Sequence, residues 1–285
     1  MTRRRVVVTG LGIVSPVGSD IATAWTNVLA GYSGIKPISA YDCSTYPTRF
    51  AGLVEGFDTL KWMGPKEVRR NDPFIHYGLG AAKMAVIDAG LEITDANRER
   101  IAVIVGSGIG GIGTIEDQCT LLNGPGGVKK VSPFFVAGCI INMVSGAISI
   151  ELGLNGPSFG IVSACTTGSH SIGMAHRMIS YGDADVVIAG GAEDTGSDRA
   201  PSCRQHRCQT GNDDGNLPDF PAAGAECLRA AAAPPGKSGA AIGFLRTRRG
   251  SAGTGRGANR LTPRPLTLQG PRSTAPHEWR PGGAD

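Results

Sequence analysis

Residues 159–180, FGIVSACTTGSHSIGMAHRMIS, contain the pattern that decides the fold. The apolar run at 159–162 predicts a buried strand that stops at Ser163 and Ala164. A helical pattern follows Cys165, with its apolar residues on or near one face: Ile172, Met174, Ala175, Met178 and Ile179. Cys165 is therefore expected at a strand-to-helix elbow.

This position gives the cysteine a chemical role to consider. Unpaired N–H groups of the first helical turn and the positive end of the helix dipole favour thiolate over thiol at Cys165. Small neighbours leave room for a substrate to approach the sulfur. A free cysteine is more commonly a buried structural residue, so the elbow alone leaves both interpretations open.

The flanking sequence resembles that of a known enzyme family. ACTTGSHSIG is preceded by GPSFGIVS and followed by RMISYGDADVVIAGGAE. These segments resemble the active-site region of the β-ketoacyl-[acyl-carrier-protein] synthases, most closely the synthase II type of bacterial fatty acid synthesis. In that family this cysteine carries the growing acyl chain as a thioester, so the resemblance implies that Cys165 is catalytic.

The chain before residue 195 alternates between strand and helix patterns. Strands are predicted at 5–9, ending in the turn Gly10-Leu11-Gly12, and at 101–105 and 185–189, with a possible short one at 50–54. Helices are expected at 21–30, 73–89 and 134–152, the last with Ser132 as N-cap. This alternation predicts an α/β fold with a sheet covered on both faces.

The resemblance makes the fold more specific. It implies a thiolase-like fold, of which residues 1–194 match the N-terminal half. The segments that match in family order include VVVTGLGIVSPVG, GSGIGG, SPFFV and INMVSG.

Composition changes abruptly near Thr195. The segment 195–285 has twelve Arg and one Lys against seven acids, ten of the 18 prolines, and a single isoleucine. It contains no valine, tyrosine or methionine. Such a segment buries too little apolar surface to fold, so we expect a disordered, non-family tail, interpreted as a frameshift or fusion product.

The remaining composition excludes several classes of protein. Seven cysteines without a CxxC pair argue against a disulfide framework and favour a reducing, cytoplasmic location. No stretch is long and apolar enough for a membrane span, and the N-terminus does not fit a signal peptide. Neither a nucleic-acid partner nor a metal or other cofactor is expected; the spacing of Cys203, His206, Cys208 and Cys227 fits no zinc pattern.

Two further motifs match known sites only superficially. Gly106-x-Gly108-x-x-Gly111 fits the dinucleotide fingerprint, but the acidic residue expected about twenty positions later is missing. The GxSxG match around Ser158 has a helix before it and a strand after it, the reverse of a hydrolase elbow, so Ser158 is predicted to be a turn residue. His170 and His176 lie on different faces of the helix, and a polar or capping role is favoured over catalysis.

The resemblance also implies the residues that bind the substrate. Ile109 and Phe134 match positions that line the acyl pocket. Lys66, Arg69 and Arg70 match a basic patch that receives acyl carrier protein, although such a cluster is by default a solvated face. The implied partners are this carrier, its acyl and malonyl thioesters, and a second copy of the chain in a homodimer.

The implied function is decarboxylative condensation of an acyl thioester with malonyl-carrier protein. The family uses two histidines, in HGT and GH motifs, to stabilise the reacting oxygens. Neither motif occurs in this sequence, so the chain is expected to be catalytically incomplete. The alternatives are a non-catalytic protein that binds the carrier, or a polyketide-type ketosynthase relative.

Overall fold

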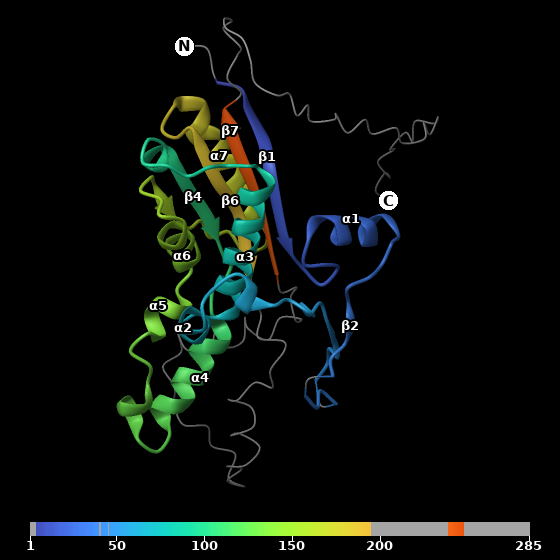
Figure 1. Cartoon of the computed structure of the whole chain (residues 1–285). Coiled ribbons are helices and arrows are strands. Elements are labelled where there is room, and N and C mark those ends of the chain that lie inside the picture. Colours follow the sequence, from blue (N-terminus) through green and yellow to red (C-terminus); the bar gives the residue numbers. More distant parts are fainter. Residues whose placement is uncertain (1–3, 40, 45, 195–238, 248–285) are drawn as a thin grey trace, which may run out of the picture. The chain divides into compact units, whose positions relative to one another are not determined.

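The central feature of the molecule is a mixed β-sheet. The structure, a computed structural model, describes residues 4–39, 41–44, 46–194 and 239–247. Within them five strands pair in the order β1-β7-β6-β4-β5, and Figure 1 shows β1, β7, β6 and β4 side by side in this order. Their bounds are β1 Val6–Val14, β4 Ile101–Gly106, β5 Ser158–Phe159, β6 Val186–Glu193 and β7 Gly239–Thr247. β7 is antiparallel to both its neighbours, whereas β4 is parallel to β5 and β6.

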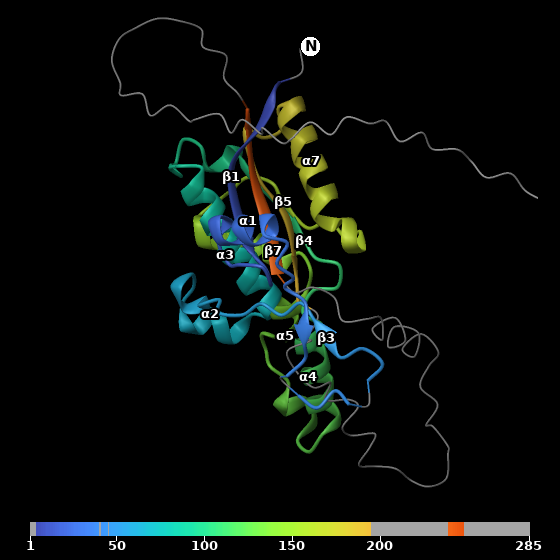
Figure 2. The same cartoon turned by 90° about the vertical axis from the view of Figure 1, so that its right-hand side faces the viewer.

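Helices cover both faces of this sheet. Figure 2 shows α3 (Pro73–Asp88) and α7 (Thr167–Tyr181) on opposite sides of the strands. Side chains of α3 and of α6 (Met143–Leu152) form one core with Val103 and Val105 of β4. The other core joins α7 to the opposite face, through residues such as Ala102, Val187 and Ile179. The α/β prediction is therefore confirmed.

The first strand is longer than the sequence predicts. β1 continues through Gly10 and Gly12, with only an irregular register between Val8 and Gly10. A Cβ at Gly10 would lie 2.2 Å from the Ala85 carbonyl oxygen, and one at Gly12 would lie 1.9 Å from that of Ala81. These glycines therefore do not end the strand but allow the backbone of α3 to pack directly on it.

The expectation of a tail without order is wrong for one segment. Gly239–Thr247 forms β7, between β1 and β6. Ile242 is 2% exposed and belongs to the core with α3, while Leu245 is 4% exposed and packs on the α7 side. These two apolar side chains, three residues apart, reach opposite faces of the sheet. The rest of 195–285, including Cys203, His206, Cys208 and Cys227, lies outside the described residues.

The predicted helix at 134–152 is interrupted. α5 (Phe135–Cys139) and α6 are separate, and Ser132 does not cap either helix in the predicted way. The N-cap of α5 is Phe134, which makes no side-chain cap bond, while the Ser132 hydroxyl accepts a bond from the Phe134 N–H. The break separates α5, whose Cys139 is buried, from α6, whose Val144 and Ile148 belong to the core with α3.

Shorter elements complete the described chain. The predicted helices at 21–30 and 73–89 are confirmed as α1 and α3, which begin after the N-cap residues Asp20 and Asp72. The predicted strand at 50–54 is reduced to β3. The remaining bounds are α1 Ile21–Leu29, β2 Lys36–Pro37, β3 Phe50–Ala51, η1 Thr59–Lys61, α2 Pro65–Arg70, η2 Arg98–Arg100, α4 Ile112–Asn123, η3 Gly127–Lys130 and η4 Ala164–Thr166.

Two properties of the whole described region matter for function. None of its helices has both the length and the apolar character needed to cross a membrane. The sheet residues Val103, Val105 and Val187 are fully buried, whereas Val162, beyond the end of β5, is 55% exposed.

Candidate active site

Cys165 lies where the sequence predicts it, at an elbow before a helix. It belongs to η4, directly before α7, and its side chain is exposed. The strand before it is much shorter than predicted: β5 covers only Ser158–Phe159, and the chain leaves the sheet before Val162. The prediction of a buried strand at 159–162 is therefore wrong. Ser158 is a residue of this edge strand, not of a turn, and lies beside the Ser149 hydroxyl.

The backbone at the elbow is strained. Ala164 has a φ of 49°, the one positive φ at a non-glycine residue in the described chain. The preceding residue is held firmly: the Ser163 N–H donates to Thr167 Oγ1, and the Ser163 carbonyl accepts a bond of 2.7 Å from Thr166 Oγ1. Its hydroxyl lies 2.6 Å from His170 Nδ1. First-turn residues of α7 thus fix the conformation that presents Cys165.

The start of α7 is open on the side of the nucleophile. Thr166, at its N-cap, makes no side-chain cap bond, while the Thr166 and Thr167 N–H groups donate to the Ser163 and Ala164 carbonyls. The helix packs tightly on β6, where a Cβ at Gly168 would lie 3.4 Å from the Gly191 nitrogen. A helix of this length carries a partial positive charge at this end, which stabilises negative charge that develops on a substrate oxygen.

The helix is rotated relative to the predicted apolar face. Its buried residues are Thr167, Ser171, Ala175 and Ile179, whereas Ile172 and Met174 are about 40% exposed. His170 has the polar role that the sequence favours, through its contact with Ser163, and His176 is exposed. Small residues at 171 and 175 face the sheet because they let the helix approach it closely.

The glycine-rich turn after β4 already contains an anion. The carboxylate of Glu193, at the end of β6, accepts bonds from Ser107 Oγ (2.9 Å), the Gly108 N–H (2.5 Å) and the Ile109 N–H (3.3 Å). Successive N–H groups of this kind form a concave anion site. Since a protein carboxylate occupies it, the geometry agrees with the sequence argument against a dinucleotide site at Gly106–Gly111.

Burial shifts the pKa of this carboxylate. Desolvation raises the pKa of Glu193 above its ordinary value, and the hydrogen bonds from the turn act in the opposite direction. Sequence reasoning missed Glu193 as an individual residue, because its partners lie 84–86 positions earlier in the chain.

The two residues predicted to line an acyl pocket lie on the surface of this chain. Ile109 is 50% exposed and follows Gly108, whose Cβ position lies 3.5 Å from Ala164 Cα. The Ile109 turn is therefore packed against the elbow of Cys165. Phe134 is 43% exposed and lies at the start of α5. A cation–π contact places Phe134 next to Arg70.

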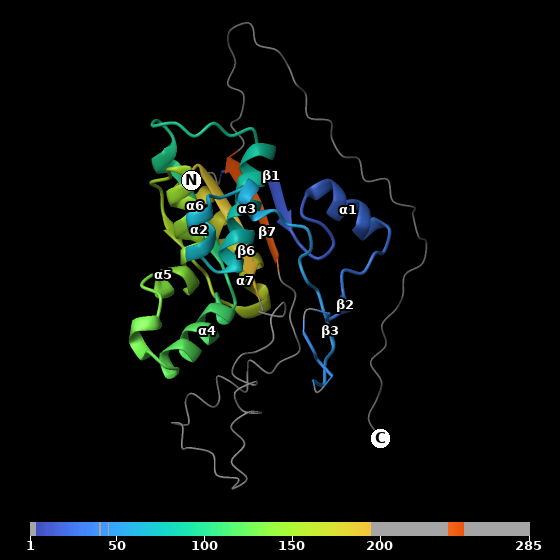
Figure 3. The same cartoon turned by 60° about the horizontal axis from the view of Figure 1, so that its bottom comes forward.

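The predicted carrier patch occupies one short helix. Lys66, Arg69 and Arg70 are exposed residues of α2, and Figure 3 shows α2 beside α5. The guanidinium carbon of Arg70 lies 4.3 Å from the centroid of the Phe134 ring, in a cation–π contact. The structure thus joins one residue of the carrier patch to one residue of the predicted pocket.

Two buried polar residues, Asp72 and Ser145, form hydrogen bonds that link the helices and strands around this site. Asp72 caps α3 by accepting from the Phe74 N–H, and its other oxygen accepts a 2.7 Å bond from Thr114 Oγ1 of α4. Burial, with a further contribution from the charge of Asp72, raises the pKa of the nearby Cys139 thiol.

Ser145 bonds to both the N–H and the carbonyl of Val105 and to the Phe159 carbonyl. The sequence around Ser145 does not predict these bonds, because Val105 lies 40 positions earlier in the chain.

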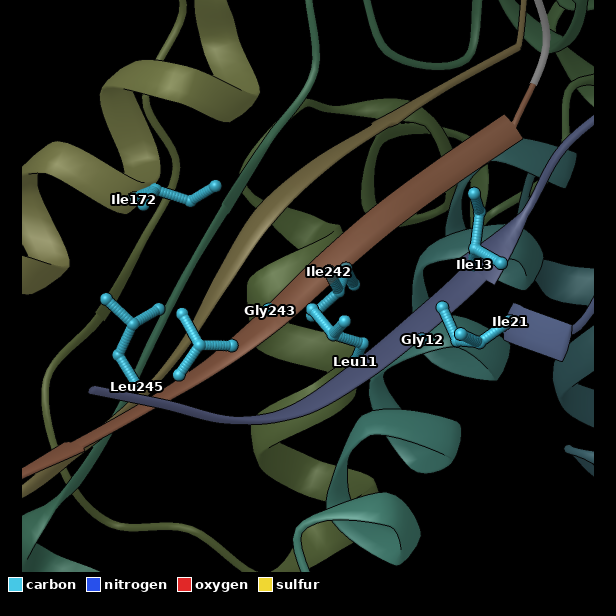
Figure 4. Close-up of a pocket in the computed structure, with 9 residues that line it drawn as sticks. Leu11, Gly12, Ile13, Ile21, Ile172, Ile242, Gly243 and Leu245 are labelled. Atoms are coloured by element: carbon cyan, nitrogen blue, oxygen red, sulfur yellow. The ribbon is translucent and has the colours of Figure 1, made fainter. Parts of the chain in front are cut away.

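One hollow of the described chain does not include Cys165 in its lining. It is an apolar groove of about 260 Å³ formed mainly by β1 and β7, with Ile21 of α1 and Ile172 of α7 at its sides, as Figure 4 shows. Val8 and Leu11 of β1 are exposed there, at 57% and 45%. On this face α7 packs mainly on β6 and β4, so part of β1 remains uncovered.

No group of three or more His, Cys, Asp or Glu side chains suited to a metal ion occurs in the described part of the chain.

Comparisons with known proteins agree with this geometry. The profile of the family "Beta-ketoacyl synthase, N-terminal domain" matches residues 3–217. The 3-oxoacyl-[acyl-carrier-protein] synthase 2 of Vibrio cholerae is 52% identical over 195 residues, which cover 68% of this chain and 46% of that protein. The chain thus spans about half the length of such relatives.

Solved structures support the same conclusion about the fold. A beta-ketoacyl synthase from Burkholderia phymatum matches with a TM-score of 0.65 and 25% identity, over 86% of this chain and 59% of that one. A ketosynthase from a type II PKS complex matches with a TM-score of 0.63 and 23% identity, over 86% and 64%, which is a likeness of fold alone. The predicted thiolase-like fold, represented by its N-terminal half, is confirmed, and the chain belongs to the β-ketoacyl synthase family.

Proposed function

We propose that this chain is the nucleophile-bearing half of a 3-oxoacyl-[acyl-carrier-protein] synthase, with Cys165 as the residue that takes the acyl group. One observation carries the proposal: Cys165 is exposed at a strained elbow, directly before a helix whose N-cap makes no side-chain cap bond. A buried structural cysteine would need none of these features.

The acyl-transfer step follows from the local groups. The Cys165 thiolate attacks the carbonyl carbon of an acyl thioester, an S–C bond forms, and the carrier thiolate leaves and takes up a proton. Negative charge gathers on the carbonyl oxygen during the attack. The N-terminal end of α7, which follows Cys165 directly, favours this negative charge through the helix dipole.

We propose the binding roles by resemblance. Ile109, on the turn packed against the elbow, and Phe134 would contact the acyl chain. Lys66, Arg69 and Arg70 would steer acyl carrier protein, an acidic partner, through long-range attraction. The carrier is part of the name of the Vibrio relative. Homodimer formation and a cytoplasmic location remain part of the proposal.

The second step, condensation with malonyl-carrier protein, requires donors that this sequence lacks. None of its five histidines is followed by Gly-Thr or preceded by Gly. Each missing acid–base group typically lowers the rate by about 10²–10⁴-fold. We therefore propose that this chain alone forms the acyl thioester but does not condense it at a useful rate.

The apolar groove on β1 and β7 agrees with this division. In the whole family fold a second half supplies a further layer, and the bare part of this sheet face is where an added layer would bury Val8 and Leu11. The competing proposals are a non-catalytic carrier-binding protein and a polyketide-type ketosynthase. The polyketide proposal is compatible with the likeness in fold to a type II PKS ketosynthase.

An assay of the purified full chain tests the proposal. Acyl-carrier protein is added to the wild type and to Cys165→Ala, and intact mass spectrometry measures the acyl adduct. An acyl adduct on the wild type alone supports the proposal. The non-catalytic alternative predicts carrier binding without an adduct on either chain.

Malonyl-carrier protein is then added to the acylated chain. Formation of β-ketoacyl product at a rate ordinary for enzymes would contradict the proposed division, because it would mean that this chain already contains the missing donors. Comparing straight acyl carriers with polyketide intermediates in the first step separates the remaining alternative.

A further inference from the structure

Glu193 binds the turn that contacts the elbow at Ala164. The acyl-transfer step does not use its carboxylate. It is the last residue of β6, and its carboxylate is largely withdrawn from solvent. Both oxygens point to one turn, between β4 and α4, and accept from Ser107, Gly108 and Ile109. The Ser107 hydroxyl in turn accepts the Gly110 N–H at 2.8 Å.

These bonds account for the shape of the whole turn. Two neighbouring N–H groups and a hydroxyl donate directly to Glu193, and the third N–H is bound through that hydroxyl. α4 begins after Gly111, which makes no side-chain cap bond. Without the carboxylate, the N–H groups of Gly108 and Ile109 would lose their acceptor in a half-buried place, which is unfavourable.

The turn is in direct contact with the nucleophile's elbow. A Cβ at Gly108 would lie 2.9 Å from Glu193 Oε2 and 3.5 Å from Ala164 Cα, so Gly108 is packed between the acid and the residue before Cys165. A Cβ at Gly106 would lie 1.9 Å from the Ile161 carbonyl oxygen. Any shift of the turn therefore changes the space beside Cys165, and Ile109 moves with it.

We propose that Glu193 is a positioning residue: its carboxylate is the resident anion of the Ser107–Gly110 turn and sets the position of Ile109 beside Cys165. The part of this inference that concerns acyl-chain fit rests on the proposed function. The part that concerns the turn rests on the hydrogen bonds alone. The tests are chosen so that the two parts fail separately.

Amide hydrogen exchange tests the turn. In the full chain, Glu193→Ala should speed exchange at the Gly108 and Ile109 amides by about tenfold or more, as expected when a bond to a charged acceptor is lost. Sodium formate, a small carboxylate that fits the vacated place, should slow it again. The matched control is Asp185→Asn, which removes an acid next to the opposite end of β6, where Arg4 and Arg100 bind it.

Exchange at Gly108 and Ile109 that stays unchanged in Glu193→Ala, or rises equally in Asp185→Asn, overturns the inference. If Glu193→Ala does not fold, Glu193→Gln and Ser107→Ala replace it. Ser107→Ala should speed exchange at Gly110 while Gly108 remains protected by the carboxylate. Equal exchange at both amides in that variant would count against the bond pattern.

Thiol labelling tests the acyl side. Methyl and hexyl methanethiosulfonate transfer their alkylthio group to a thiolate and release methanesulfinate, and site-resolved mass spectrometry follows Cys165. The preference of the wild type for the hexyl reagent should exceed that of exposed Cys119. In Glu193→Ala it should fall by about fourfold for each methylene that loses its contacts, and formate should restore it.

A preference that persists in Glu193→Ala overturns the link between the turn and acyl fit. A wild type without any hexyl preference at Cys165 instead contradicts the acyl pocket of the proposed function, while the exchange data still decide the role of Glu193. A change that followed stability alone would appear equally in Asp185→Asn.

Discussion

At the scale of single residues, the nucleophile depends on strain that its neighbours maintain. Ala164 has a left-handed backbone, which costs a non-glycine residue about 1–2 kcal/mol. Ser163 compensates through bonds to Thr166 and Thr167 and a contact with His170. All three partners lie in or next to the first turns of α7, so the start of the helix that follows Cys165 also holds the elbow in place.

Cys165 should be the thiol that reacts first with a limiting alkylating reagent. It is exposed at a helix N-terminus, whereas Cys119 is exposed within α4 and Cys139 is buried with a raised pKa. Mass spectrometry after brief treatment with iodoacetamide measures labelling at each site. Cys119 is the matched control for exposure, and equal labelling of Cys119 and Cys165 would contradict a special role for the elbow.

At the scale of elements, the Ser145 side chain forms hydrogen bonds with the backbone at the ends of β4 and β5. Ser145 of α6 is fully buried and bonds to the Val105 N–H and carbonyl of β4 and to the Phe159 carbonyl of β5. One hydroxyl thus joins a helix to two strands. It supports the short edge strand that leads into the elbow.

Ser145→Ala should lower the free energy of unfolding by about 1–3 kcal/mol, since it leaves the buried Val105 N–H without its acceptor. Ser149→Ala, one turn later in α6, removes a partly exposed hydroxyl and should cost less. Urea denaturation of both variants measures the difference. Equal losses would show that the Ser145 bonds add nothing beyond those of an ordinary helix serine.

The starts of three strands are joined by charge, which makes stability depend on pH. Asp185, before β6, has its pKa lowered from its ordinary value of 3.8, chiefly by hydrogen bonding to Arg100 and also by Arg4. A lowered folded-state pKa gives stabilisation that is present above pH 3.8 and is lost as the pH falls through the folded value.

Asp185→Asn should therefore lower the Tm at pH 7, and its difference from the wild type should close below pH 3.8. The effect should be under about 1 kcal/mol because the pair is partly exposed. Thermal unfolding of both proteins across this range measures it. A difference that persists unchanged at the acid end would contradict the assigned charge interaction.

At the scale of the whole molecule, β7 decides whether the sheet is continuous. β1 and β6 do not pair with each other; each pairs with β7. The segment 239–247 comes from a region whose composition predicts no order, yet its Ile242 and Leu245 lie in the two cores. Much of the contact between β1 and the rest of the sheet therefore depends on this one strand.

Ile242→Ala should lower the free energy of unfolding by about 2–5 kcal/mol, the usual cost of removing a large buried side chain. Ile150→Ala, at a site 78% exposed on α6, is the matched control and should be nearly neutral. Denaturant unfolding compares the two. A neutral Ile242→Ala would mean that residues 239–247 do not occupy the centre of the sheet in solution.

The sequence by itself determined the features that depend on neighbouring residues. The Cys165 elbow, the buried strand β4 and the helix α3 are all predicted from local pattern, whereas the cap of α3 at Asp72 comes from the structure. The family followed from the order of short segments. These features are predictable because capping, periodicity and backbone preference act over a few residues.

Only the tertiary structure decided the rest. The length of β1, the rotation of α7, the place of β7 and the contact of Glu193 with the Ile109 turn all involve residues far apart in the chain. Gly12 looks like a turn residue until α3 is seen packed on it. Close packing and long-range hydrogen bonds select among local structures that the sequence alone leaves nearly equal in free energy, and they do so only when the chain is folded.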